Sequence, residues 1–144
     1  MVQFAEKMKV AVLYFTLTGN TGRVAEILED DDVDLIQVKG GSRLLSLLGL
    51  VRKPKFDAVK YDLIVVGCPV WYKKAAPPFV KALKSMDFGG KQVNAFITYA
   101  LKEKSALKEV MNVVKKRNGS PGRTASFNVS KGLEESEVRK LLSF

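Results

Sequence analysis

A six-residue stretch, Thr16-Leu17-Thr18-Gly19-Asn20-Thr21, decides the fold of this chain. Apolar residues 10–15 precede it directly and a helical apolar pattern follows it from Val24, so the sequence predicts a strand, a tight turn and a helix. Threonine hydroxyls and unpaired backbone N–H groups then meet at the positive end of the helix dipole, which suits a phosphate. The stretch lacks the lysine of a nucleoside-triphosphate loop. Ordinary helix capping by Thr and Asn is the alternative interpretation.

The composition indicates a single globular domain over residues 1–144. With 47% apolar residues among 144, the chain can bury a sizeable core. No apolar run approaches the ~20 residues of a membrane span, and no signal-peptide pattern stands at the N-terminus, so we expect a cytoplasmic protein. Cys68 is the only cysteine and histidine is absent, which excludes an internal disulfide and a catalytic triad and gives no case for a metal site.

The chain is strongly basic, with a formal net charge of +9. Lys73, Lys74, Lys102 and Lys104 fall on loops expected to border the candidate site. One interpretation is a positive rim that attracts an acidic redox partner, an anionic substrate or NAD(P)H, and the other is a solvated surface without a partner. Nucleic acid is not favoured, because the basic residues are scattered and no nucleic-acid motif accompanies them.

Apolar strands alternate with amphipathic helices along the rest of the chain. We expect strands at residues 33–38, 63–66, 93–99 and 124–129, with a turn at 118–122. Helices are expected to begin at Pro77, to span residues 107–114 and to bury Val138, Leu141 and Leu142. This alternation predicts an α/β fold of three layers, with a five-stranded parallel sheet in the order 2-1-3-4-5 and helices on both faces.

In such a sheet, ligands bind at the carboxyl ends of the strands where the strand order reverses. Here that point lies between the first and third strands. The segments that follow Phe15, Gly67 and Tyr99 should therefore build one site.

Two motifs resemble those of the flavodoxin family. The threonine-rich turn is similar to the flavodoxin [ST]-x-T-G-x-T loop that holds the FMN phosphate. Residues 61–71, which read YDLIVVGCPVW, and the later Pro77-Pro78 look like the signature of a flavodoxin-like subfamily with a G-x-P-V-W loop. The resemblance covers nearly the whole chain, in order and in spacing.

The resemblance implies an FMN-binding redox protein that acts as an electron carrier, with three groups of cofactor-binding residues. The residues expected to hold the phosphate are Thr16, Leu17, Thr18, Gly19, Asn20 and Thr21. Those expected to line one side of the isoalloxazine are Pro69, Val70, Trp71 and Tyr72, and those in the opposite loop are Thr98, Tyr99, Ala100 and Leu101. Flat aromatic side chains suit a flat cofactor. Packing in the core is the alternative role for Trp71 and for Tyr99.

Several features leave the function open. The loop after Trp71 has no glycine, unlike most flavodoxins, and the loop after Tyr99 is short, so weak or absent FMN binding is an alternative. The other functional alternatives are an FMN-dependent NAD(P)H or quinone reductase and a flavin-free binding module. Electron transfer needs no catalytic side chain, because the chemistry is the flavin's own. Cys68 is expected to be a small buried apolar residue.

Overall fold

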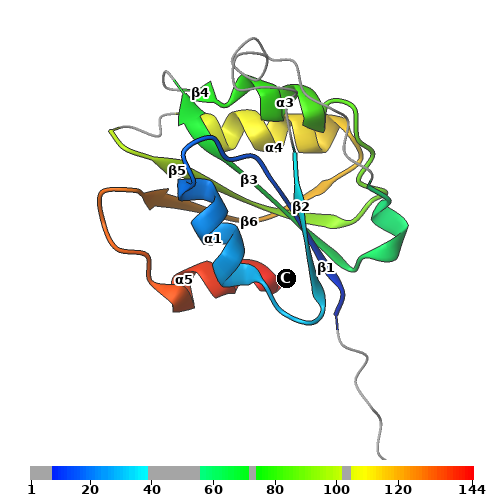
Figure 1. The fold of residues 1–144 in the computed structure, drawn as a ribbon. Coiled ribbons are helices and arrows are strands. Elements are labelled where there is room, and N and C mark those ends of the chain that lie inside the picture. Colours follow the sequence, from blue (N-terminus) through cyan, green and yellow to red (C-terminus); the bar gives the residue numbers. More distant parts are fainter. Residues whose placement is uncertain (1–7, 39–55, 72–73, 102–104) are drawn as a thin grey trace, which may run out of the picture.

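The computed structural model describes residues 8–38, 56–71, 74–101 and 105–144, and its centre is a parallel sheet. The parallel strands are β1 (Val10–Tyr14), β2 (Val33–Gln37), β3 (Leu63–Trp71), β5 (Gln92–Tyr99) and β6 (Ser120–Asn128). They lie in the order β2-β1-β3-β5-β6, which confirms the predicted order 2-1-3-4-5 when only parallel strands are counted (Figure 1). One strand is additional. The two-residue β4 (Lys74–Ala75) pairs antiparallel with the end of β3.

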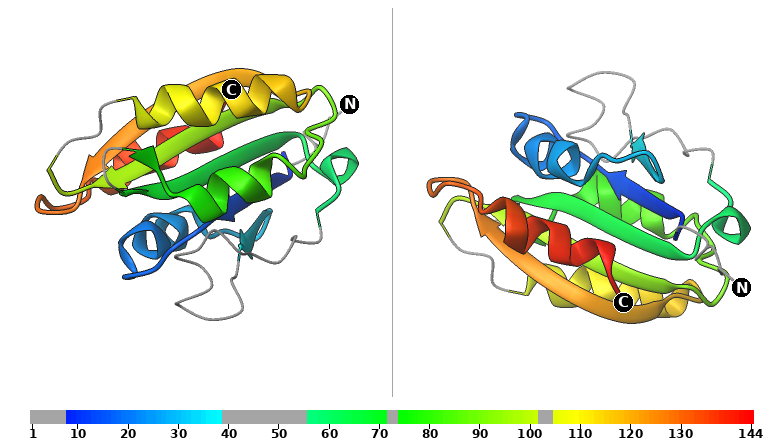
Figure 2. Two further views of the ribbon diagram at one scale, coloured as in Figure 1. Left: turned by 90° about the horizontal axis from the view of Figure 1, so that it is seen from above. Right: turned by 90° about the horizontal axis from the view of Figure 1, so that it is seen from below.

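Helices cover both faces of the sheet, as predicted. Helices α1 (Asn20–Leu28) and α5 (Glu135–Arg139) lie on one face, and α3 (Pro77–Leu83) and α4 (Ala106–Lys116) lie on the other (Figures 1 and 2). Two short 3-10 helices, η1 (Ala58–Lys60) and η2 (Lys140–Leu142), complete the described elements. None of the described helices combines the length and the apolar character that crossing a membrane requires.

Two hydrophobic clusters hold the layers together, one on each face. Successive residues of a strand point to opposite faces, so in β3 Ile64 and Val66 pack toward α3 and α4, while Leu63 and Val65 pack toward α1 and α5. All four side chains are fully buried, which explains why the strand reads as a continuous apolar run.

The last strand begins earlier than predicted. Residues 120–122, expected in a turn, belong to β6. The turn is confined to residues before Ser120, where Asn118 has a φ of 63°. Pro121 is accommodated because β6 is an outer strand, and its pairing with β5 shifts register between Val93 and Ala95. The apparent turn signal is therefore the sequence of a bulged edge strand.

Candidate functional site

Three strand ends meet at the carboxyl edge of the sheet. β1 lies between β2 and β3, so the strand order reverses beside it, as predicted. The Phe15 N–H donates to the Gly67 carbonyl at 3.0 Å, which fixes the start of the threonine-rich turn against β3. Pro69 of β3 pairs in register with Thr98 of β5. The fold thus brings together the segments after Phe15, after Gly67 and at Tyr99.

The threonine-rich turn leaves two of its hydroxyl protons available as hydrogen-bond donors. Thr16 Oγ1 accepts from the Gly19 N–H at 3.1 Å, and Thr18 Oγ1 accepts from Asn20 Nδ2 at 3.4 Å. In both bonds the hydroxyl oxygen is the acceptor, so each hydroxyl proton remains free to be donated.

The start of α1 is uncapped within the described part of the chain. Its N-cap is Gly19, which has no side chain and adopts a left-handed φ of 97°. The first helical bond is from Arg23 N–H to the Gly19 carbonyl. The N–H groups of Asn20, Thr21 and Gly22 therefore have no acceptor among the described residues. Ordinary capping by Thr or Asn, the alternative for this stretch, is not what the structure adopts.

Thr21 has a different role from its neighbours. Its side chain is 1% exposed, and its hydroxyl lies 2.8 Å from the hydroxyl of Thr98, which is 2% exposed. The pair joins the first turn of α1 to the end of β5. The Thr21 side chain thus anchors the helix start, while its backbone N–H stays at the candidate anion site.

The aromatic residues of the site point in different directions. Trp71 is half-buried and meets the Phe15 ring edge-on, with centroids 5.5 Å apart and planes at 80°. Tyr99 is half-buried and lines a cavity over β6, on the far side of β5 from β3. Pro69 and Val70 are half-buried, while Ala100 and Leu101 are exposed, Leu101 by 91%. Tyr72 and Lys73, as well as Lys102 and Lys104, lie outside the described residues.

The hairpin after Trp71 is held in place by the neighbouring helix. Trp71 pairs with Lys74 and Val70 with Ala75, so two residues connect the strands. Glu109 of α4 accepts from the Ala75 N–H at 3.2 Å. No sequence motif indicated that Glu109 would make this contact. Its position in the first turn of α4 is the one feature of the sequence that is consistent with it.

Cys68 is confirmed as a buried apolar residue. It is fully buried between the strand ends, and burial raises the pKa of its thiol to about 12. Hydrogen bonding with the Ala76 backbone lowers this pKa and Glu109 raises it, both by less than burial does. The thiol therefore stays protonated at neutral pH and is not a nucleophile.

A second cavity beside the turn includes residues that sequence reasoning did not select. It has a volume of about 210 Å³ and lies between the start of α1, β5 and the loop after β6. Its lining includes Asn20 and Thr98, together with Arg23, Phe127 and Lys131. The topology could have suggested this loop, because it also follows the carboxyl end of a parallel strand.

Sequence comparisons find flavodoxins among the proteins similar to this chain. No family model matches the chain. The chain is 24% identical over 141 residues to a flavodoxin of Synechocystis, covering 91% of this chain and 76% of that protein. It is 27% identical over 134 residues to flavodoxin 1 of Escherichia coli K12, covering 83% of this chain and 72% of that protein.

Solved structures show the same fold. A flavoprotein of Lactobacillus acidophilus, solved in complex with FMN, superposes with a TM-score of 0.70 at 24% identity, covering 95% of this chain and all of that one. A flavodoxin from an archaeon superposes with a TM-score of 0.65 at 18% identity, covering 93% of each chain. The chain is thus similar in sequence to flavodoxins over most of its length and shares the fold of solved flavodoxins and flavoproteins.

Proposed function

We propose that the chain binds FMN and carries electrons between redox partners. The observation that carries this proposal is the uncapped start of α1 with its free donors, at the sheet edge where the strand order reverses. The proposal is supported by the flavodoxins similar in sequence and by the neighbouring flavoprotein structure that contains FMN.

The donor set fits a phosphate monoester. The backbone N–H groups of residues 20–22 and the hydroxyls of Thr16 and Thr18 are all neutral donors, and the helix dipole adds partial positive charge. A Cβ built on Gly19 would meet no atom within 4 Å, so there is open space directly beside the turn. These residues would hold the phosphate without a metal ion.

The flat part of the cofactor would lie against the loops at the ends of β3 and β5. Pro69, Val70 and Trp71 would line one side, and the other side would be formed by Tyr99, Ala100 and Leu101. The half-buried state of Trp71 and its edge-on contact with Phe15 support this role, because the ring is fixed and still partly accessible. Bound FMN would supply the electron-transfer chemistry. The protein would position it and shield it from water.

Titration with FMN and with riboflavin tests the proposal. We expect FMN to bind with a change in its visible absorption and fluorescence, and riboflavin, which lacks the phosphate, to bind more weakly. Trp71→Ala should leave the bound flavin brighter in fluorescence, because stacked aromatic side chains quench it. No spectral change with FMN at any concentration would refute FMN binding by this chain.

We further propose that the redox partner is acidic. The net charge of +9 attracts anions over distances of about a Debye length, roughly 8 Å at physiological salt. Lys74 is exposed on the hairpin after Trp71, next to the candidate ring site.

The reduced, FMN-loaded protein can be oxidised by ferricyanide, an anion, or by a cationic cobalt complex. Oxidation by ferricyanide is expected to slow as salt is added, and oxidation by the cobalt complex to quicken. Lys74→Glu should slow the ferricyanide reaction several-fold at low salt, whereas Lys84→Glu, which reverses an exposed lysine just after α3, should have less effect. Equal salt dependence with both oxidants would contradict a positive rim.

A further inference from the structure

The outer edge of β6 is open over its second half. Within the described part of the chain, no strand pairs with this side of β6, which ends the sheet. The Val129 N–H donates to the Tyr99 carbonyl of β5 at 2.8 Å. Because successive residues of a strand direct their backbone groups to opposite sides, the N–H and C=O groups of Thr124, Ser126 and Asn128 point away from β5.

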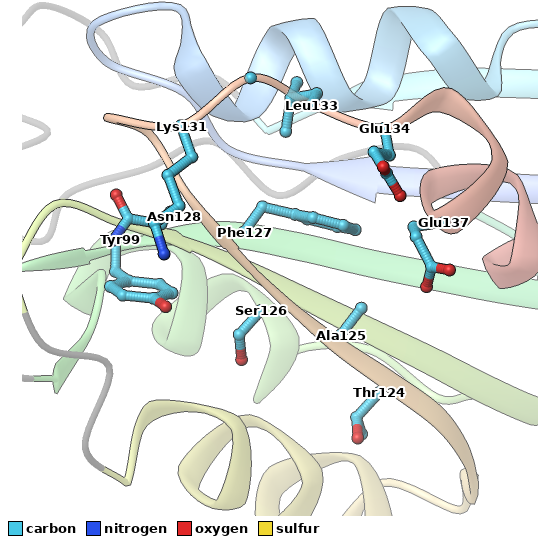
Figure 3. Close-up of a pocket in the computed structure, with 11 residues that line it drawn as sticks. Tyr99, Thr124, Ala125, Ser126, Phe127, Asn128, Lys131, Leu133, Glu134 and Glu137 are labelled. Carbon is cyan, nitrogen blue, oxygen red and sulfur yellow. The ribbon is translucent and has the colours of Figure 1, made fainter.

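The first half of β6 is protected from pairing with another strand, and the second half is not. Pro121 has no N–H to offer, and the register shift opposite Val93 and Ala95 distorts the strand near it. Natural proteins use proline, bulges and charged residues to block pairing at exposed edges. The segment from Thr124 to Asn128 reads TASFN and has none of these features. It is also the segment that borders the cavity of about 480 Å³ (Figure 3).

The side chains around this cavity differ in charge from one end of β6 to the other. Lys131 lies beside Asn128, at the carboxyl end of the strand, whereas Glu137 lies near Ala125, toward the amino end (Figure 3). Phe127 is only half-buried and presents apolar surface to the same cavity. Glu137 is paired with Lys140 at 2.8 Å, and Glu134 also lines the cavity. An incoming strand would therefore meet the positive charge of Lys131 at one end, two carboxylates, one of them already paired, toward the other, and the apolar surface of Phe127 as well.

We propose that this edge binds a second copy of the chain, with its β6 antiparallel to the first and a two-fold axis at Ser126. Ser126 would pair with its counterpart, and Thr124 with Asn128 of the partner. The Ser126 N–H groups would donate to the Ser126 carbonyls, the Asn128 N–H groups to the Thr124 carbonyls and the Thr124 N–H groups to the Asn128 carbonyls, giving six hydrogen bonds across the axis. The Asn128 carbonyl already accepts from the Lys131 N–H and would accept a second bond from Thr124.

Charge and shape favour a second copy over an unrelated strand. The two-fold axis reverses the direction of the partner, so the Lys131 end of each subunit approaches the Glu137 end of the other. With the axis at Ser126, even-numbered residues pair with even-numbered ones and odd-numbered with odd-numbered. Ala125 of each subunit therefore lies opposite Phe127 of the other, on the same face of the joined sheet. The two candidate FMN sites would lie at opposite ends of this sheet. The pairing does not depend on FMN binding.

Crosslinking through a single introduced cysteine tests the register. Cys68 is fully buried, so Ser126→Cys introduces the one reactive thiol of the described chain. Paired strands place opposite Cα atoms about 5.5 Å apart, within the range that a disulfide spans. Mild oxidation of the full chain should give a covalent dimer for Ser126→Cys, and little for Thr124→Cys or Asn128→Cys alone. A mixture of these last two variants should crosslink to each other. Equal crosslinking of all three single variants would overturn the register.

Sedimentation of the full chain over about 1 μM to 1 mM tests the association itself. The wild type is expected to dimerise reversibly. Ser126→Pro removes an outward N–H and no bond to β5, so it should weaken dimerisation by about tenfold or more, while Ser126→Ala should not. Circular dichroism confirms that each variant is folded. A wild type that stays monomeric throughout, or a Ser126→Pro variant that dimerises as well as Ser126→Ala, overturns the proposal.

Discussion

Replacement of Thr16 and Thr18 together by alanine is expected to weaken FMN binding by about 2–6 kcal/mol. Each hydroxyl can donate one charge-assisted hydrogen bond to the phosphate, and each such bond contributes roughly 1–3 kcal/mol. Both hydroxyls accept bonds from within the turn, from the Gly19 N–H and from Asn20 Nδ2, so their protons are the groups left to donate. Fluorescence titration with FMN measures the loss.

Riboflavin and Thr21→Val serve as the two controls for this experiment. Riboflavin has no phosphate, so its binding to the double variant should be nearly that of the wild type. The Thr21 hydroxyl is occupied by Thr98, so Thr21→Val should reduce thermal stability and change FMN affinity less than loss of Thr16 and Thr18 does. Equal losses for FMN and riboflavin would place the phosphate elsewhere.

The sequence predicts the topology well because the parallel strands are buried on both faces. Continuous apolar runs such as residues 63–66 leave little ambiguity, and their alternation with helices restricts the connections. The strand β4 could not be predicted, since two residues carry no periodic pattern. It forms because Lys74 and Ala75 fold back on β3 and the Ala75 N–H finds Glu109 of α4.

The convergence of the three strand-end segments was predictable, and the side-chain contacts among them were less so. Strand ends at a topological switch point converge whatever their sequence, so the segments around Thr18 and Trp71 were identified from order alone. The hydrogen bond between Thr21 and Thr98 joins residues 77 positions apart and leaves no local signature. The side-chain direction of Tyr99 depends on which face of β5 the residue occupies. Tyr99 is the last residue of β5, where the alternation of buried and exposed side chains along the strand stops, so the sequence does not predict that face.

The structure explains why the motif residue at position 67 is a glycine. It pairs directly with Phe96 on the neighbouring strand, and the Phe96 ring lies where a Cβ on Gly67 would be. The ring is fully buried in the cluster under α1 and α5, so it cannot move aside without cost. An aromatic side chain thus covers a cross-strand glycine, just before the strand end that contributes to the site.

Gly67→Ala is therefore expected to destabilise the protein by roughly 3 kcal/mol, because the added methyl group overpacks the core. Phe96→Ala alone should cost about 3–5 kcal/mol through the cavity that it leaves. The double variant should cost less than the sum by about 1–3 kcal/mol, since the clash disappears with the ring. Urea unfolding measures all three.

Gly22→Ala, inside α1, is the matched control. Its added methyl group would lie at an ordinary contact distance of 3.5 Å from Thr16 Cγ2, so this variant should stabilise the protein by about 0.5–1 kcal/mol. Strict additivity of Gly67→Ala and Phe96→Ala would show that the ring is not what excludes a side chain at position 67.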